Sequence, residues 1–131
     1  MKTLFFLTIL ATVSAFSSAK AADTTVEMLN KRDDGAKMAF SEDITRIDVG
    51  DTVTWVPTSK GHNVEFIAGP DGFNTPKKSK SSKEVSITFD EPGIYYYWCS
   101  PHKSMGMIAL VVVGGDKSNI EDIAGAKAVG K

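Results

Sequence analysis

The chain has 131 residues, which is enough for one domain with a single hydrophobic core. Hydrophobic side chains make up 42 %, as is typical of soluble globular proteins, and 15 basic residues nearly balance 16 acidic ones. So small a net charge argues against nucleic acid binding or strong membrane binding as a function.

The first 21 residues have the composition of a signal peptide. Lys2 gives a positively charged start, and residues 4–15 are nearly all apolar or small, over a length too short to cross a bilayer easily. Small side chains precede a cleavage point after Ala21. A membrane anchor or a helix buried in the domain is the alternative interpretation. We expect residues 1–21 to be removed on export and residues 22–131, with 13 basic and 16 acidic side chains, to form the mature domain.

The mature chain consists of short segments with strand-like composition, separated by turns. Residues 44–49 and 51–57 alternate in polarity, whereas residues 68–82 contain the glycines, prolines and lysines of a loop. Strands are predicted over residues 24–29, 36–40, 44–49, 51–57, 63–67, 84–89, 94–98 and 107–113. The last of these is apolar throughout, which indicates a strand covered on both faces.

After Gly114 and Gly115 the pattern changes to that of one short helix. Apolar side chains recur at helical spacing at Ile120, Ile123, Ala124 and Ala128. Either Asp116 or Ser118 is expected to cap the helix N-terminus. Seven or eight short strands without alternating helices predict an all-β sandwich or barrel rather than a parallel sheet.

Cys99 is the only cysteine of the chain. Exported proteins usually carry cysteines in pairs, because disulfides form in oxidising compartments. A single cysteine cannot form an internal disulfide, so Cys99 is a buried bystander, a reactive thiol, an intermolecular bridge or a metal ligand.

The neighbours of Cys99 favour the metal ligand. The stretch that joins the two strongest predicted strands contains Cys99, His102 and Met107, and Pro101 turns the chain so that the first two side chains can face one site. His62, near the start of another strand, can complete the set. Two imidazoles, a thiolate and a thioether match the trigonal His₂Cys site with a distant axial Met that is typical of electron-transfer copper. We predict one copper ion per chain, held by His62, Cys99, His102 and Met107.

Met105 is the alternative axial ligand, because it lies three residues after His102. Met107 is favoured because it opens an apolar strand whose direction the sheet fixes. Taken singly, each residue has an ordinary explanation: a lone histidine is usually a satisfied polar group, and a lone methionine usually fills a core.

Two other classes of function use similar residues. Cys99 and His102 could be the nucleophile and base of an enzyme. However, they lie on one tight loop without an obvious orienting acid, and the His-x-His pairs of multicopper oxidases are absent from the sequence. We therefore expect no enzyme. A copper carrier or a zinc-storage protein remains the second alternative, since zinc accepts the same donors.

Several segments resemble the pseudoazurins, a family of blue-copper proteins. They are residues 95–111 (YYYWCSPHKSMGMIALV), 27–31 (EMLNK), 50–53 (GDTV) and 60–65 (KGHNVE). The resemblance covers essentially the whole mature chain and implies a cupredoxin fold, an eight-stranded Greek-key sandwich. It implies the same four copper ligands. It also implies that the Asn63 backbone N–H donates to the Cys99 sulfur, that the Asn63 side chain ties two ligand loops together, and that Met38 packs near His102.

The resemblance further implies a periplasmic, monomeric electron carrier. Its partners would be redox proteins such as copper nitrite reductase, c-type cytochromes or a peroxidase. They would dock on an apolar patch around His102, formed by Pro101, Met105 and Met38. The lysines expected to rim this patch are Lys31, Lys60, Lys77, Lys78, Lys80, Lys83 and Lys103. In one respect the sequence departs from the family, because many pseudoazurins end in two helices and this chain has room for one.

Overall fold

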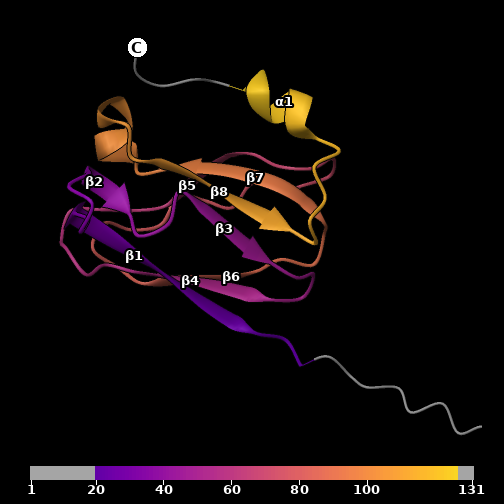
Figure 1. Cartoon of the computed structure of the whole chain (residues 1–131), viewed down its shortest axis with the longest axis horizontal. Helices are drawn as coiled ribbons and strands as arrows, with labels where there is room; N and C mark the ends of the chain where they lie inside the picture. Colours follow the sequence, from indigo (N-terminus) through magenta and orange to yellow (C-terminus); the bar gives the residue numbers. More distant parts are fainter. Residues whose placement is uncertain (1–19, 127–131) are drawn as a thin grey trace, which may run out of the picture.

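Eight strands form two four-stranded sheets that pack face to face in the computed structural model, which describes residues 20–126 (Figure 1). The first sheet has the order β2-β1-β4-β6 and the second β3-β8-β7-β5. The elements are β1 (Asp23–Lys31), β2 (Lys37–Phe40), β3 (Ile44–Ile47), β4 (Thr52–Val56), β5 (Glu65–Ala68), β6 (Val85–Thr88), β7 (Gly93–Trp98), the 3₁₀ helix η1 (Ser100–Met105), β8 (Ile108–Val113) and α1 (Ile120–Ala124). The predicted all-β sandwich with one short C-terminal helix is confirmed.

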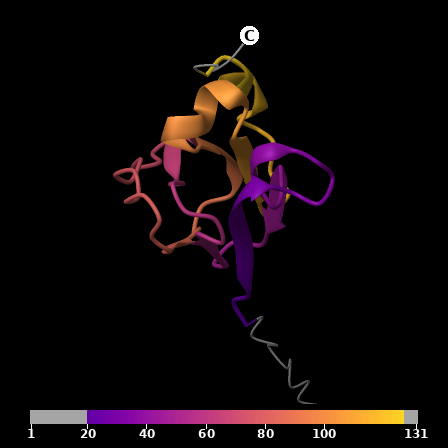
Figure 2. The same ribbon diagram turned by 90° about the vertical axis from the view of Figure 1, so that its left-hand side faces the viewer.

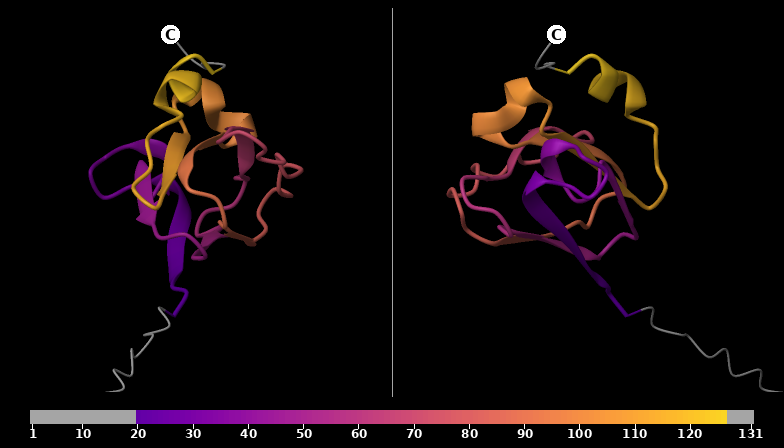
Figure 3. Two further views of the ribbon diagram at one scale, coloured as in Figure 1. Left: turned by 90° about the vertical axis from the view of Figure 1, so that its right-hand side faces the viewer. Right: turned by 60° about the vertical axis from the view of Figure 1, so that its left-hand side comes forward.

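The strand pairings mix the two directions. β1 pairs with β4 and β3 with β8 in parallel, while the other neighbours are antiparallel. Both sheets are therefore mixed, and neither is an all-parallel sheet. The long segment 69–84 contains no strand and loops out at one side of the sandwich (Figures 2 and 3), as the glycines and prolines in it predict.

Alternating burial along the strands places one face of each sheet in a common core. In β3, Thr45 and Ile47 are buried while Ile44 and Arg46 are exposed, as the sequence pattern predicts. The centre of the core is the ring of Trp55, which lies 5.2 Å from Tyr97 and 5.7 Å from Phe66 in edge-to-face contacts. Such aromatic contacts join the two sheets and give the core a fixed geometry.

The outer face of the second sheet is only partly covered. Both η1 and α1 lie over β7 and β8 (Figure 3), but Ile108 at the start of β8 is 39 % exposed. A groove of about 410 Å³ runs between the sheet and α1 and is lined by Leu110 and Ile123 among others. The expectation that β8 is covered on both faces is therefore wrong at its first residue.

The residue that precedes α1 is Asn119, which is one residue after Ser118 and three after Asp116, so neither predicted cap is used. The Asn119 side chain makes no hydrogen bond to the helix N-terminus. The Asp116 carboxylate accepts a hydrogen bond from the Ser118 N–H and forms a local turn instead. Asn119 is 8 % exposed because its side chain is used elsewhere: Oδ1 accepts from the Ile94 N–H at 2.9 Å and Nδ2 donates to the Ile94 carbonyl at 2.8 Å. This pair anchors α1 to the start of β7.

Two expectations lie outside the described residues. The signal peptide falls almost entirely on residues 1–19, and Ala128 lies beyond residue 126. Within residues 20–126, no helix is long and apolar enough to span a membrane.

Arg32 closes the hairpin between β1 and β2. Its guanidinium donates hydrogen bonds to the carboxylates of Asp34 and Asp43, at distances down to 2.8 Å, and to the carbonyl of Phe40 at 3.1 Å. The guanidinium holds the pKa of Asp34 at about 2, below its ordinary value of 3.8. Because the folded pKa is depressed, the stabilising contribution of Asp34 is present above pH 3.8 and is lost as pH falls through 2.

We therefore predict that Asp34→Asn destabilises the protein at neutral pH but not in strong acid. Urea unfolding of both proteins, followed by tryptophan fluorescence between about pH 6 and pH 2, measures the difference in free energy of unfolding. That difference should shrink through the window between the two pKa values. A difference that stays constant down to pH 2 would contradict the role assigned to Arg32.

Candidate metal centre

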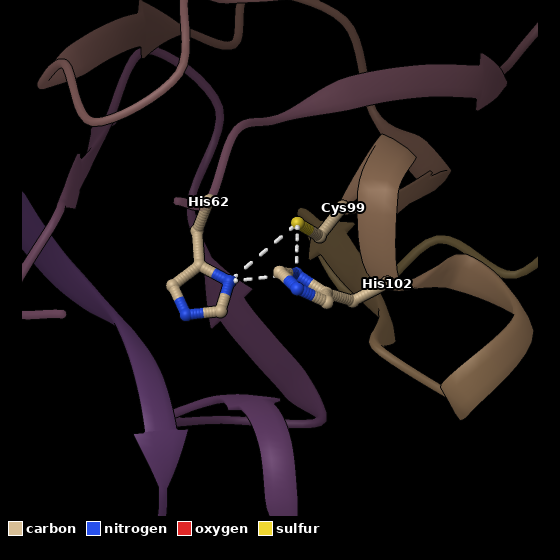
Figure 4. A group of neighbouring side chains, drawn as sticks. All are labelled: His62, Cys99 and His102. Atoms are coloured by element: carbon tan, nitrogen blue, oxygen red, sulfur yellow. Dashed lines mark hydrogen bonds between the residues drawn. The ribbon is translucent and has the colours of Figure 1, made fainter. Parts of the chain in front are cut away.

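Three side chains from two segments meet at one end of the sandwich (Figure 4). The Nδ1 atoms of His62 and His102 are 3.1 Å apart, and the Cys99 sulfur lies 3.6 Å from the first and 3.4 Å from the second. The point equidistant from the three atoms is roughly 2.0 Å from each, which is close to the usual metal–nitrogen distance. A metal–sulfur bond is longer, at about 2.3 Å, so an ion bound by all three atoms would lie slightly farther from the Cys99 sulfur than from the two nitrogens.

The backbone around η1 positions three of the four predicted ligands. Cys99 directly follows β7 and Met107 directly precedes β8, and the Cys99 N–H donates to the Met107 carbonyl at 3.0 Å. Between them, the His102 N–H donates to the Cys99 carbonyl at 3.1 Å and the Met107 N–H to the His102 carbonyl at 3.2 Å. Pro101 opens η1 and Gly106, with φ of 88°, ends it in the left-handed conformation that favours glycine. Sequence reasoning predicted the turn but not the 3₁₀ helix.

His62 comes from the segment before β5 and is fully buried. Its Nε2 atom lies 2.8 Å from the Asn30 side-chain oxygen on β1. Because an amide oxygen only accepts, the ring proton is on Nε2, and the Nδ1 lone pair faces Cys99 and His102. Asn30 thus fixes both the tautomer and the orientation of the ring. Sequence reasoning assigned Asn30 no role, although it belongs to the quoted segment 27–31.

Burial adjusts the protonation of these groups. It lowers the pKa of His62, and the nearby charge of His102 lowers it further, so the imidazole is neutral and able to bind a metal. Burial raises the pKa of the Cys99 thiol, while the backbone of Asn63 and of His102 acts in the opposite direction by hydrogen bonding. A bound cation would complete the deprotonation of the thiol.

The two methionines of the loop differ sharply in burial. Met107 is fully buried and belongs to the core cluster, together with Cys99, whereas Met105 is 56 % exposed. The backbone hydrogen bond between Cys99 and Met107 keeps Met107 beside the site. The geometry therefore favours Met107 over Met105 as the fourth donor.

Comparison with known proteins identifies the family. Residues 26–114 match the family model of copper-binding proteins of the plastocyanin/azurin family, and this range contains every predicted ligand. The chain belongs to the plastocyanin/azurin family. Its members are electron carriers rather than enzymes. The predicted copper cofactor and electron-transfer role are therefore confirmed at the level of the family.

Several similar members of the family are pseudoazurins. The pseudoazurin of Methylorubrum extorquens is 43 % identical over 79 % of this chain and 70 % of its own length. That of Paracoccus pantotrophus is 42 % identical over 82 % of this chain and 74 % of its own. A solved pseudoazurin from a Sinorhizobium species superposes with a TM-score of 0.79 at 45 % identity, covering 84 % of this chain and 87 % of that one. The resemblance to pseudoazurins is confirmed.

Asn63 ties the two ligand segments together, as the resemblance to pseudoazurins implied. Its Oδ1 atom accepts a hydrogen bond from the Ser100 N–H at 2.8 Å, and its Nδ2 donates to the Ser100 hydroxyl at 3.1 Å. Asn63 is 6 % exposed and follows His62 directly, so these bonds join the segment before β5 to the Cys99 loop. The role predicted for Met38 near His102 stays a prediction; Met38 itself is half-buried against the core and has φ of 49°.

His102 reaches the surface at one edge of this copper-family site. It is half-buried, and Pro101 and Met105 beside it are exposed. Six of the seven lysines expected around the site are exposed: Lys31, Lys60, Lys77, Lys78, Lys80 and Lys83. Lys103 differs from them, because it is half-buried and its ammonium group lies 4.7 Å from the centre of the Trp98 ring. It is engaged in a cation–π contact within the chain.

Proposed function

We propose that this chain carries single electrons between redox proteins of the periplasm on one copper ion bound by His62, Cys99, His102 and Met107. The observation that supports this most is the triangle of one sulfur and two Nδ1 atoms, with sides of 3.1 to 3.6 Å. A thiolate, two imidazoles and a distant thioether are the donors that suit electron-transfer copper. The bound ion supplies the Cu(II)/Cu(I) couple.

The chain's own contribution is to keep these donors in place in both oxidation states. Cys99 is set by the β7–β8 pairing, and His62 is set by Asn30 from another sheet. Both are fully buried, so solvent does not reach either donor directly. Because neither donor has room to move, the electron can be gained or lost with little rearrangement of the site.

Cys99→Ser tests the proposal. The oxidised wild-type protein loaded with Cu²⁺ should show an intense thiolate-to-copper absorption band and the EPR signal of a copper–thiolate site. It should bleach reversibly with a mild reductant. Cys99→Ser should lose the band, because the hydroxyl cannot replace the thiolate. A band that survives in Cys99→Ser would refute the ligand assignment. A wild-type protein that binds only colourless zinc would favour the storage alternative.

The axial donor is tested by a matched pair of variants. Met107→Gln should lower the reduction potential and alter the EPR spectrum, because an amide oxygen stabilises Cu(II) more than a thioether does. Met105→Gln introduces the same side chain at an exposed position of the same loop and should leave both unchanged. Voltammetry and EPR of the two proteins measure the difference. The reverse pattern would assign the axial position to Met105.

We further propose that residues 1–21 direct export and that the mature chain acts as a monomer. Its partners would be acidic redox proteins such as copper nitrite reductase, c-type cytochromes or a peroxidase. The support is the exposed edge of His102 beside Pro101 and Met105, with exposed lysines in the surrounding segments. Such a charged rim speeds encounter, and a small apolar centre allows rapid release.

If lysines attract an acidic partner, the rate of electron transfer to that partner should fall as the salt concentration rises. In stopped-flow mixing with a copper nitrite reductase, the electron-transfer rate should drop as ionic strength rises. The double variant Lys77→Glu/Lys80→Glu should lower the rate at low salt by about tenfold. Lys117→Glu is the control, because Lys117 belongs to the segment between β8 and α1, which lies at the opposite end of the sandwich from η1 (Figure 1). Electrostatic steering would be dropped from the proposal if both variants changed the electron-transfer rate equally, or if the rate did not depend on salt.

A further inference from the structure

One carboxylate oxygen connects the two residues that flank Cys99. The Oε2 atom of Glu65 accepts a hydrogen bond from the Trp98 indole N–H at 2.7 Å. The same atom accepts a hydrogen bond from the Ser100 hydroxyl at 2.7 Å. Glu65 itself is the first residue of β5 and not a candidate ligand. A single acceptor therefore holds the chain on both sides of the predicted thiolate.

The strand register explains this contact. Glu65 lies directly opposite Trp98 in the antiparallel β5–β7 pair, so both side chains project from the same face of the sheet. Cys99, one residue on, points the other way into the core. Trp98 is only 3 % exposed, so its indole N–H needs a partner inside the protein. The Lys103 ammonium group lies 4.7 Å from the centre of the same indole ring.

The carboxylate also sets the direction of the hydrogen bonds that lead to Cys99. An ionised carboxylate only accepts, so the single Ser100 hydroxyl proton is donated to Glu65. The Ser100 oxygen is then available to accept from the Asn63 amide at 3.1 Å, while Asn63 Oδ1 accepts from the Ser100 N–H at 2.8 Å. The Asn63 backbone in turn hydrogen-bonds the sulfur. The side-chain donors thus run from Asn63 through Ser100 to the carboxylate, while the Ser100 N–H donates back to Asn63.

We infer that Glu65 is a positioning residue of the copper site, which fixes the Cys99 thiolate by accepting hydrogen bonds from both Trp98 and Ser100. The inference rests on the proposed ligand set. It assigns to Glu65 a geometric role that is separate from the effect of its charge. The hydrogen bonds from Ser100 and Trp98 lower the pKa of Glu65, so the carboxylate is ionised at neutral pH and its charge must be tested separately.

Two substitutions separate geometry from charge. Glu65→Gln removes the charge but keeps an oxygen, and because both hydrogen bonds fall on one oxygen atom, the amide can reproduce them. Glu65→Leu removes the charge and both bonds. The control Glu84→Leu removes an equal charge from an exposed position in the lysine-rich segment. Copper affinity, the EPR spectrum and the reduction potential are measured for all three proteins and the wild type.

Positioning predicts that Glu65→Gln keeps the wild-type EPR spectrum and copper affinity, with a raised reduction potential from the lost negative charge. Glu65→Leu should bind copper about 10- to 100-fold more weakly and show an altered spectrum. In the metal-free proteins, the Trp98 indole proton should exchange with solvent faster in Glu65→Leu than in Glu65→Gln. Glu84→Leu should match the wild type in affinity, spectrum and exchange. Equal behaviour of Glu65→Gln and Glu65→Leu would overturn the inference.

Ser100→Ala keeps the test decisive if Glu65→Leu does not fold. It removes the hydroxyl that joins Glu65 to Asn63 but leaves the Trp98 contact, so copper affinity should fall and the spectrum should change. If Ser100→Ala kept the copper affinity and the EPR spectrum of the wild type, the inference would be overturned. Failure of the proposed function is distinguishable, because the wild-type protein would then lack the copper–thiolate band. Failure of this inference alone would leave that band intact in every variant.

Discussion

The site depends on the antiparallel pairing of β7 with β8. The register runs without interruption from Gly93 opposite Val113 to Trp98 opposite Ile108, and the hydrogen bond from Cys99 to Met107 continues it by one step. The intervening residues are thereby closed into a short loop whose length brings a thiolate, an imidazole and a thioether to one place. Core packing around Trp55 and Tyr97 holds the pair of strands still. Any change that shifts this register moves three donors at once.

The fourth donor is held by a different part of the molecule. His62 is oriented by Asn30 on β1, and its neighbour Asn63 is tied to the Cys99 loop. The site thus joins both sheets through side-chain hydrogen bonds, and the proposed copper ion would join them a second time. Groups around the ligands fix tautomers and orientations, which matters as much to a redox centre as the identity of its donors.

Sequence reasoning could propose the ligands because histidine and cysteine are rare in this chain and three of the four candidates lie on one loop. Strand positions followed from alternation, since Thr45 and Ile47 are buried where the pattern places them. The hydrogen-bond partners of these residues were harder to predict from the sequence. Asn30 lies 32 residues before His62, and Glu65 faces Trp98 only once the strands are paired. The two parallel pairings and the use of Asn119 as an anchor for β7 likewise depend on contacts between distant segments, which local composition does not encode.

Among the four proposed ligands, only His102 has surface in contact with solvent; His62, Cys99 and Met107 are enclosed. His102 is therefore the proposed ligand that a partner protein could approach most closely. A donor and an acceptor that both dock at the exposed edge of His102 must bind one after the other, because two large molecules cannot occupy the same small area together. The proposed carrier would then bind its donor and its acceptor in succession and would not form one lasting complex with both. Very tight binding would slow such a carrier, because each partner must dissociate before the next one can bind.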